Sequence, residues 1–232
     1  MSFKAKPTHI AGRIVSTLFI TLVLSAGVFA QVEKKVATAV LIDNTGSMRS
    51  QFNLVIDLSR GIAAQAQPRG PVKLFNFMPQ GSGPGSIALI SSKRGWTEDQ
   101  GSLDATIDDL YVVPGQTKLV DAIMSLALDL NEKVALNPDA YSSKVIFLVT
   151  DGEDRSSKIS TKDLIKLLKD SNIQVNAIGL VEELENDRFG SATKRADAKD
   201  LLQRLTKETG GRVVFTGRRA AVDDVLQRLW NK

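Results

Sequence analysis

Residues 36–47 read Val-Ala-Thr-Ala-Val-Leu-Ile-Asp-Asn-Thr-Gly-Ser, an apolar run that ends at one carboxylate and two hydroxyls. The run 36–42 is apolar at nearly every position, as expected of a strand that is covered on both faces. Asp43, Thr45 and Ser47 follow it at every second position. This stretch therefore predicts a buried strand whose carboxyl end carries three oxygen-bearing side chains.

The rest of the chain repeats the alternation of short, β-branched apolar runs with longer segments of helical period. Five further strands are expected, at 72–78, 86–90, 144–150, 173–180 and 212–216. Between them, apolar residues recur at spacings of three and four, which predicts amphipathic helices that pack on the sheet. The pattern is typical of an α/β fold in which helices cover both faces of a mostly parallel, six-stranded sheet. The most apolar run, 145–149, should lie in the middle of that sheet.

One connection differs from the others. Residues 79–85 read Pro-Gln-Gly-Ser-Gly-Pro-Gly, which is too short for a helix and rich in turn-forming residues. We therefore expect a hairpin here, which would make the third strand antiparallel and place it at an edge of the sheet. This glycine cluster does not match a phosphate-binding loop, because no Gly-Lys-Ser/Thr follows it.

The first thirty residues have the pattern of a secretory signal. A start with three basic residues and no acid leads into an apolar run at 14–30, and Val28 and Ala30 suit cleavage after Ala30. An uncleaved membrane anchor is the alternative, because about 17 to 25 apolar residues can span a bilayer. We therefore expect residues 1–30 to be a signal and residues 31–232 to form one exported domain, either periplasmic or secreted.

The composition excludes several kinds of chemistry. The chain is 43% hydrophobic and 24% charged, as is usual for a globular domain. It has no cysteine, and its single histidine, His9, lies in the expected signal. Disulfides, thiol catalysis and zinc sites of the usual Cys or His type are therefore excluded from the mature protein. The net charge of +4 owes most of its excess to the three basic signal residues, so nothing predicts nucleic-acid binding.

Polar side chains from three separated segments are expected to meet at one edge of the sheet. Asp43 and Asp151 each follow a strand, and Thr117 begins a helix that runs antiparallel to those strands. Ligands of open α/β sheets bind beyond the carboxyl ends of the strands. Together with Thr45 and Ser47, these residues offer only oxygen donors, which suit a hard cation such as Mg²⁺ with about six oxygen ligands. Two carboxylates only neutralise such an ion, so it would still attract a carboxylate from another protein.

The same residues resemble the metal-ion-dependent adhesion site of von Willebrand factor type A domains. The resemblance rests on Asp43-x-Thr45-x-Ser47 after one strand, Thr117 before a helix and Asp151-Gly152 after the most apolar strand. It extends over residues 36–231 and implies a three-layer, Rossmann-like fold. It also implies that the three hydroxyls bind the metal, with the two aspartates bound directly or through water. The ion would be Mg²⁺, or else Mn²⁺ or Ca²⁺, and the partner a protein that supplies Asp or Glu, without catalytic turnover. The commonest family form has serine where this chain has Thr45, whose extra methyl group can alter the geometry or affinity of the site.

Two alternatives remain open from the sequence. Asp43-Asn44-Thr45-Gly46-Ser47 also resembles the phosphorylated-aspartate motif of haloacid-dehalogenase-type phosphotransferases. Asp43 would then be the nucleophile, and Asp151 would help to hold Mg²⁺. That class also carries a later Gly-Asp-x-x-x-Asp motif and a cap domain, which this sequence lacks. The other alternative is a metal-free structural domain anchored at the membrane, because Asp, Ser and Thr are also common helix caps and turn formers. Glu153 and Asp154 are expected to be solvated loop or first-turn acids.

Overall fold

The computed structural model describes residues 1–2, 33–80, 87–186 and 191–231. Apart from its first two residues, the predicted signal at 1–30 lies outside this part of the chain, and so does most of the predicted hairpin connection. The chain from Lys34 onward forms one folded unit. Among the helices that the structure describes, none is long and apolar enough to cross a bilayer.

A mixed sheet runs through the domain in the strand order β4-β3-β2-β1-β5-β6-β7. Its strands are β1 (Lys35–Ile42), β2 (Val72–Gln80), β3 (Ile87–Ser91), β4 (Gln116–Thr117), β5 (Tyr141–Thr150), β6 (Ile173–Gly179) and β7 (Val213–Phe215). Six of them match the predicted strands, and β3 is antiparallel to β2, as predicted. The two-residue strand β4 was not predicted, and it pairs with β3 on the side away from β2.

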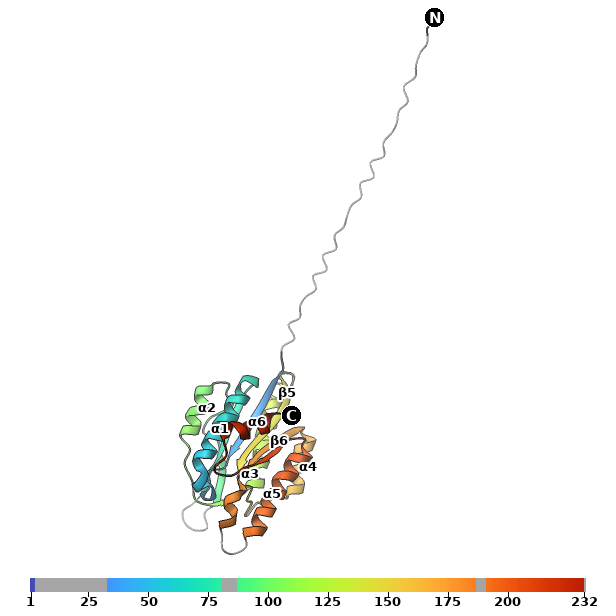
Figure 1. Cartoon of the computed structure of the whole chain (residues 1–232). Helices are drawn as coiled ribbons and strands as arrows, with labels where there is room; N and C mark the ends of the chain where they lie inside the picture. The colour runs from blue at the N-terminus through green and yellow to red at the C-terminus, as the bar shows by residue number, and fades with distance from the viewer. Residues whose placement is uncertain (3–32, 81–86, 187–190, 232) are drawn as a thin grey trace. The chain divides into compact units, whose positions relative to one another are not determined.

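Helices cover both faces of this sheet (Figure 1). The α-helices are α1 (Phe52–Ala66), α2 (Gln100–Asp108), α3 (Leu119–Ala135), α4 (Thr161–Asp170), α5 (Ser191–Glu208) and α6 (Val222–Trp230). Short 3-10 segments are η1 (Gly46–Gln51), η2 (Gln67–Arg69), η3 (Pro138–Ala140) and η4 (Val181–Asn186). Side chains of α1, α2 and α6 pack on one face, and those of α3, α4 and α5 on the other. The predicted three-layer α/β fold is therefore confirmed.

The central strands β1 and β5 are buried on both faces. In β5, Ile146 and Leu148 pack in the layer of α3, whereas Phe147 and Val149 pack in the layer of α1 and α6. Burial of apolar surface on both faces favours one register, because a slip by one residue would turn every side chain to the other face. In this register Ile42 lies opposite Val149. The two strands consequently end side by side at one edge of the sheet.

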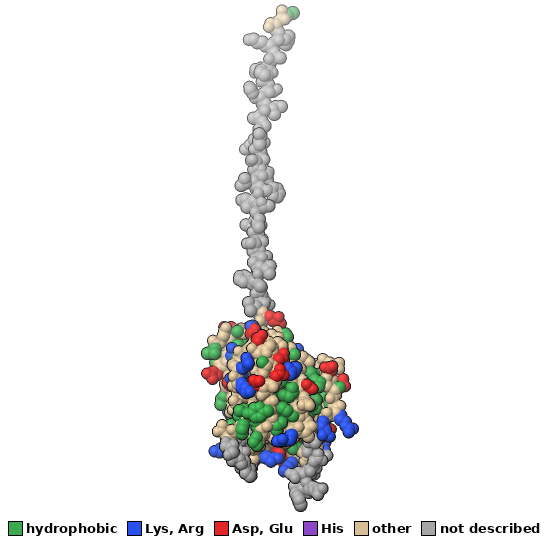
Figure 2. Space-filling view, turned by 90° about the vertical axis from the view of Figure 1, so that its left-hand side faces the viewer, with side chains coloured by type: hydrophobic (Ala, Val, Ile, Leu, Met, Phe, Trp, Pro, Cys, Tyr) green, Lys and Arg blue, Asp and Glu red, His purple; other side chains and the backbone are tan. Residues whose placement is uncertain are grey.

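Helices α1 and α2 lie on the side of the domain shown in Figure 2. Arg60 of α1 pairs with Asp104 and Asp108 of α2 at 3.3 and 2.8 Å, and Leu103 and Ile107 of α2 are buried beneath them. Basic and acidic side chains are interspersed in the upper part of this face, and apolar side chains gather lower down. Helix α2 was not predicted, because two apolar residues one turn apart are too weak a periodic signal.

Candidate metal centre

Asp43, the first residue after β1, is fully buried. Its Oδ1 accepts hydrogen bonds from the backbone N–H of Thr45 at 3.1 Å and from the Thr45 hydroxyl at 2.7 Å. Its Oδ2 accepts a hydrogen bond from the hydroxyl of Thr150, at the end of β5, at 2.7 Å. Burial raises the pKa of Asp43 above its ordinary value, and the hydrogen bonds from Thr45 and Thr150 oppose that rise. The carboxylate is therefore held in one orientation at the carboxyl edge of the sheet.

Three hydroxyls form a connected row beside Asp43. Thr117 Oγ1 donates to Thr45 Oγ1 at 3.1 Å, and Thr45 Oγ1 lies 3.3 Å from Ser47 Oγ. Thr45 and Thr117 are buried, whereas Ser47 is half-buried. The N-cap residues of η1 and α3 are Thr45 and Lys118, and neither makes a side-chain capping bond. The structure thus brings together residues of two predicted segments, and helix capping is the wrong explanation for these hydroxyls.

Asp151, the first residue after β5, is 2% exposed. Its Oδ1 accepts a hydrogen bond from the backbone N–H of Glu153 at 2.9 Å. Its Oδ2 is buried and has no hydrogen-bond partner of ordinary geometry among the described residues. Burial and the nearby charge of Asp43 raise the pKa of Asp151 to about 7, although the Ser47 hydroxyl opposes this rise. Asp151 therefore lies close to both Asp43 and Ser47, as the sequence predicted.

Neither aspartate is neutralised by a basic side chain in the part of the chain that the structure describes. Buried carboxylates are normally paired with a cation or protonated, because an isolated buried charge loses its hydration. The combination of Asp43 and Asp151 thus leaves up to two negative charges uncompensated at this edge.

The turn after β5 requires glycine. Gly152 has a φ of +77°, and a Cβ atom there would lie 3.0 Å from the carbonyl oxygen of Ala198 and from the side chain of Leu202. The Gly152 N–H donates to the Thr150 hydroxyl at 3.0 Å. Thr150, which sequence reasoning missed as a site residue, therefore connects the Asp43 carboxylate to the loop that carries Asp151.

Asn44, which sequence reasoning also missed as a site residue, holds the loop after β1 in place. Its side-chain amide donates to the carbonyl groups of Phe77 at 3.1 Å and Tyr111 at 2.8 Å, and its Oδ1 accepts from the N–H of Phe77 at 2.8 Å. Its backbone carbonyl accepts from the N–H of Val113 at 2.8 Å. These bonds join the loop of Asp43 to β2 and to the segment that leads into β4. No spacing in the sequence points to them, because all three partners lie far along the chain from Asn44.

Glu153 differs from its predicted role as a solvated loop acid. It is 8% exposed, and its carboxylate pairs with Arg155 at 2.6 Å and with Lys194 of α5 at 3.7 Å. The prediction was wrong because Lys194 reaches Glu153 only through the tertiary fold. Asp154 is exposed, in line with the prediction, and its Oδ1 accepts from the N–H of Val120 in the first turn of α3 at 3.3 Å.

The donor set consists of two carboxylates and three hydroxyls. Among the residues that the structure describes, no group of three or more Asp, Glu, His or Cys side chains could hold a metal ion. A metal at this edge would therefore need the hydroxyls as well as the carboxylates, which suits a hard ion such as Mg²⁺ or Mn²⁺ better than Zn²⁺. The unpartnered Oδ2 of Asp151 and the uncompensated negative charge both fit such an ion.

Comparisons with known proteins address the fold. Among solved structures, an aerotolerance-related membrane protein from Bacteroides fragilis, with multiple mutations to serine, is similar at 18% identity and a TM-score of 0.56, covering 84% of this chain and 98% of that chain. The manganese-loaded TRAP protein of Plasmodium vivax is similar at 17% identity and a TM-score of 0.54, covering 85% and 74%. The SpRpn10 VWA domain is similar at 17% identity and a TM-score of 0.50, covering 84% and 95%. At these identities the similarity is evidence for the fold alone.

Sequence comparison addresses the family. A search of curated proteins finds no match. The family model of the von Willebrand factor type A domain, in contrast, matches residues 39–228. Because this match covers most of the chain and includes all the elements that build the carboxyl edge, the protein belongs to the von Willebrand factor type A domain family.

Proposed function

We propose that this domain binds a divalent cation at the carboxyl edge of its sheet and, through that ion, a carboxylate of a protein partner. The proposed ligands are the hydroxyls of Thr45, Ser47 and Thr117 and the carboxylates of Asp43 and Asp151, bound directly or through water. Mg²⁺ and Mn²⁺ are the preferred ions, with Ca²⁺ as an alternative. Von Willebrand factor type A domains commonly bind divalent metals and generally act as protein-interaction modules, which supports the proposal. The P. vivax TRAP protein, which has a similar fold, was solved loaded with manganese.

The observation that carries the proposal is the pair of buried, unneutralised carboxylates of Asp43 and Asp151. Both pKa values are raised, which means that the fold without a cation makes ionisation less favourable than it is in water. A bound divalent ion would supply two positive charges for the two carboxylates and a partner for Asp151 Oδ2. The hydroxyl ligands would add no charge, so a further coordination position would still favour an anionic oxygen.

The phosphotransferase alternative has less support. A nucleophilic aspartate needs an oxygen that can reach the substrate. Asp43 is fully buried, and both of its oxygens accept hydrogen bonds from neighbouring groups. Its geometry favours a fixed ligand over an attacking group, so binding is the function that we propose.

Calorimetric titration of the purified protein with MnCl₂ tests the metal site. We expect uptake at one site and loss of that uptake in Asp151→Asn, which keeps the shape of the side chain and removes its charge. Asp139→Asn, at an exposed aspartate before β5, is the matched control and should bind like the unaltered protein. Absence of Mn²⁺ and Mg²⁺ uptake by the unaltered protein would end the proposal.

Partner binding requires a separate experiment. The purified protein, immobilised as bait, should retain a protein from envelope extracts in Mg²⁺ and release it in EDTA. Asp43→Ala should abolish retention while its circular dichroism spectrum stays native. Equal retention with chelator, or by the Asp43→Ala variant, would contradict the role of the metal in partner binding.

We also propose that the protein is exported after cleavage behind Ala30, on the basis of the basic and apolar pattern of residues 1–30. Intact mass spectrometry of the protein from the envelope fraction tests this. The expected species begins at Gln31, whereas a membrane-bound species that retains residues 1–30 would favour the uncleaved anchor.

A further inference from the structure

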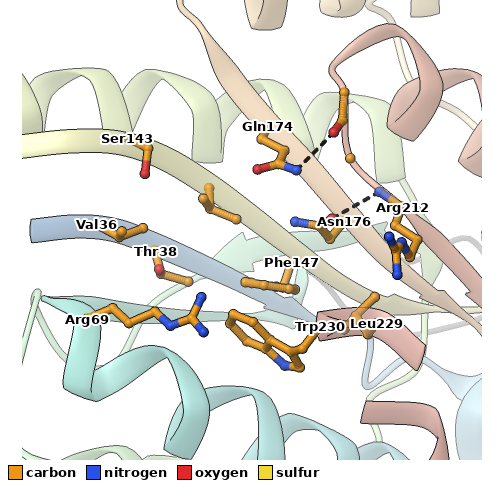
Figure 3. Close-up of a pocket in the computed structure, with 13 residues that line it drawn as sticks. Val36, Thr38, Arg69, Ser143, Phe147, Gln174, Asn176, Arg212, Leu229 and Trp230 are labelled. Atoms are coloured by element: carbon orange, nitrogen blue, oxygen red, sulfur yellow. Dashed lines mark hydrogen bonds between the residues drawn. The ribbon is translucent and has the colours of Figure 1, made fainter. Parts of the chain in front are cut away.

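A cavity of about 280 Å³ lies at the other end of the sheet, near the amino ends of β1, β5 and β6 (Figure 3). Its floor is built from strand residues that include Thr38, Val145 and Phe147, and its wall includes Leu229 and Trp230 of α6. The aromatic rings of Phe147 and Trp230 lie 4.9 Å apart, centroid to centroid. The cavity therefore has a partly aromatic interior.

Among the described residues, the lining contains two guanidinium groups and no carboxylate. Arg69, at the end of η2, lies with its Cζ 4.5 Å from the centroid of the Trp230 ring. Arg212, just before β7, donates from Nη1 to the backbone carbonyls of Arg228 and Asn231 at the end of α6. Within the described residues, neither Arg69 nor Arg212 pairs with an acid. The described lining residues thus carry a net positive charge.

Uncharged polar side chains of β6 also line the cavity. Asn176 is 8% exposed, and its Oδ1 accepts a hydrogen bond from the Arg212 N–H at 3.0 Å. Its amide nitrogen points away from this bond, toward β5 (Figure 3). Gln174 donates to the carbonyl of Gly210 at 3.0 Å. These bonds fix the side chains of Asn176 and Gln174. The amide nitrogen of Asn176 is therefore a hydrogen-bond donor beside the apolar surface of the cavity.

We propose that this cavity binds a small organic acid, in which a carboxylate is joined to an apolar body. The carboxylate would pair with Arg69, whose guanidinium is held in place by stacking on Trp230 and whose planar N–H groups match a carboxylate. The apolar body would contact Val145, Phe147 and Trp230. The volume lies just below the range of about 300 to 1,000 Å³ that is typical of small-molecule pockets, so it suits a small ligand. This site is independent of the proposed metal site.

Ligand-observed NMR titration of the purified protein in EDTA tests the proposal without any contribution from the metal site. The probes are 4-phenylbutyrate and its neutral isostere, 4-phenylbutanamide. We expect saturable binding of the acid and binding of the amide that is weaker by about tenfold, as for the loss of one partly exposed, charge-assisted hydrogen bond. No saturable binding of the acid, or equal binding of the amide, would overturn the proposal.

Two variants and one control locate the site. Arg69→Gln should weaken binding of 4-phenylbutyrate by about tenfold. Arg204→Gln removes an exposed arginine on α5 that pairs with Asp200 outside the cavity, and it should leave binding unchanged. Ser143→Phe places an aromatic ring in the cavity from an exposed strand position, where an aromatic residue is well tolerated. It should abolish binding. It therefore tests the site independently if Arg69→Gln destabilises the fold. Full binding by the Ser143→Phe variant would place the ligand elsewhere and overturn the assignment.

Discussion

The hydroxyl of Thr150 donates a hydrogen bond to the carboxylate of Asp43 across the boundary between β5 and β1, with an Oγ1 to Oδ2 distance of 2.7 Å. The same hydroxyl accepts a hydrogen bond from the N–H of Gly152 at 3.0 Å. One buried side chain therefore links the two loops that carry the proposed aspartate ligands.

Replacement of Thr150 by valine should lower the free energy of unfolding by about 1 to 3 kcal/mol, because a buried acceptor and a buried N–H both lose their partner. It should also weaken Mn²⁺ binding, since Asp43 loses a fixed orientation. Chemical denaturation and calorimetry measure the two effects. Thr150→Ser keeps the hydroxyl and should restore both quantities. A valine variant as stable as the unaltered protein would show that this bond contributes nothing.

The stability of the metal-free protein should fall as the pH rises from about 5 to 7. A carboxyl group whose pKa is higher in the folded than in the unfolded state favours folding at low pH, and this contribution is lost as the pH rises through the folded value. Burial and the charge of Asp43 raise the pKa of Asp151 to about 7. The only histidine of the chain is His9, in the predicted signal. In EDTA, the melting temperature should therefore fall as the pH rises over this range. The fall should be smaller in the Asp151→Asn variant.

Mn²⁺ should cancel that dependence. Metal ligands must be deprotonated, so an ion bound by Asp43 and Asp151 should stabilise the fold more at about pH 8 than at about pH 6. Thermal unfolding with saturating MnCl₂, compared with EDTA at each pH, measures this difference. If Mn²⁺ raised the melting temperature equally at both pH values, metal binding would not depend on deprotonation of the two aspartates.

Thr45 offers a matched pair of substitutions. Thr45→Ser keeps the hydroxyl that contacts Asp43, Ser47 and Thr117, so Mn²⁺ affinity should stay within about threefold of the original value. Thr45→Val keeps the shape and removes the hydroxyl, so affinity should fall by tenfold or more, about 1.4 kcal/mol, through loss of a ligand and of these hydrogen bonds. Calorimetric titration distinguishes the two outcomes. Equal affinities in both variants would exclude the Thr45 hydroxyl as a ligand.

Asn44 should contribute to stability without binding metal. Asn44→Asp replaces the amide that donates to the carbonyl groups of Phe77 and Tyr111, and it adds a buried charge beside Asp43. We expect the free energy of unfolding to fall by about 3 kcal/mol or more. Asn53→Asp, at an exposed position in α1, should have little effect. Similar denaturation curves for the two variants would contradict the structural role of Asn44.

The fold could be predicted because apolar periodicity reflects burial directly. The continuous apolar run of β5 indicates a strand covered on both sides, and the structure places it in the centre of the sheet. Strand β4 could not be predicted, because Gln116 and Thr117 have no strand-like pattern of their own. They pair only with a neighbouring strand that is already in place.

The proposed metal ligands could be located because topology alone brings the carboxyl ends of parallel strands to one edge. Thr150, Asn44 and the ion pairs of Glu153 depend on contacts between segments far apart in the chain. Such contacts follow from the packed geometry, and no local spacing encodes them. The sequence thus indicates which side chains reach the edge but not which groups hold them there.

Strand β5 extends from the cavity near Ser143 to the turn after Thr150. At about 3.3 Å per residue, these positions are separated by roughly 23 Å along the strand. A protein partner bound at the carboxyl edge of the sheet would therefore leave the entrance of the cavity at the other end exposed to solvent. If both proposals hold, one molecule of this protein can form a ternary complex. A protein partner would occupy the metal site while a small organic acid occupies the cavity at the opposite end of the sheet.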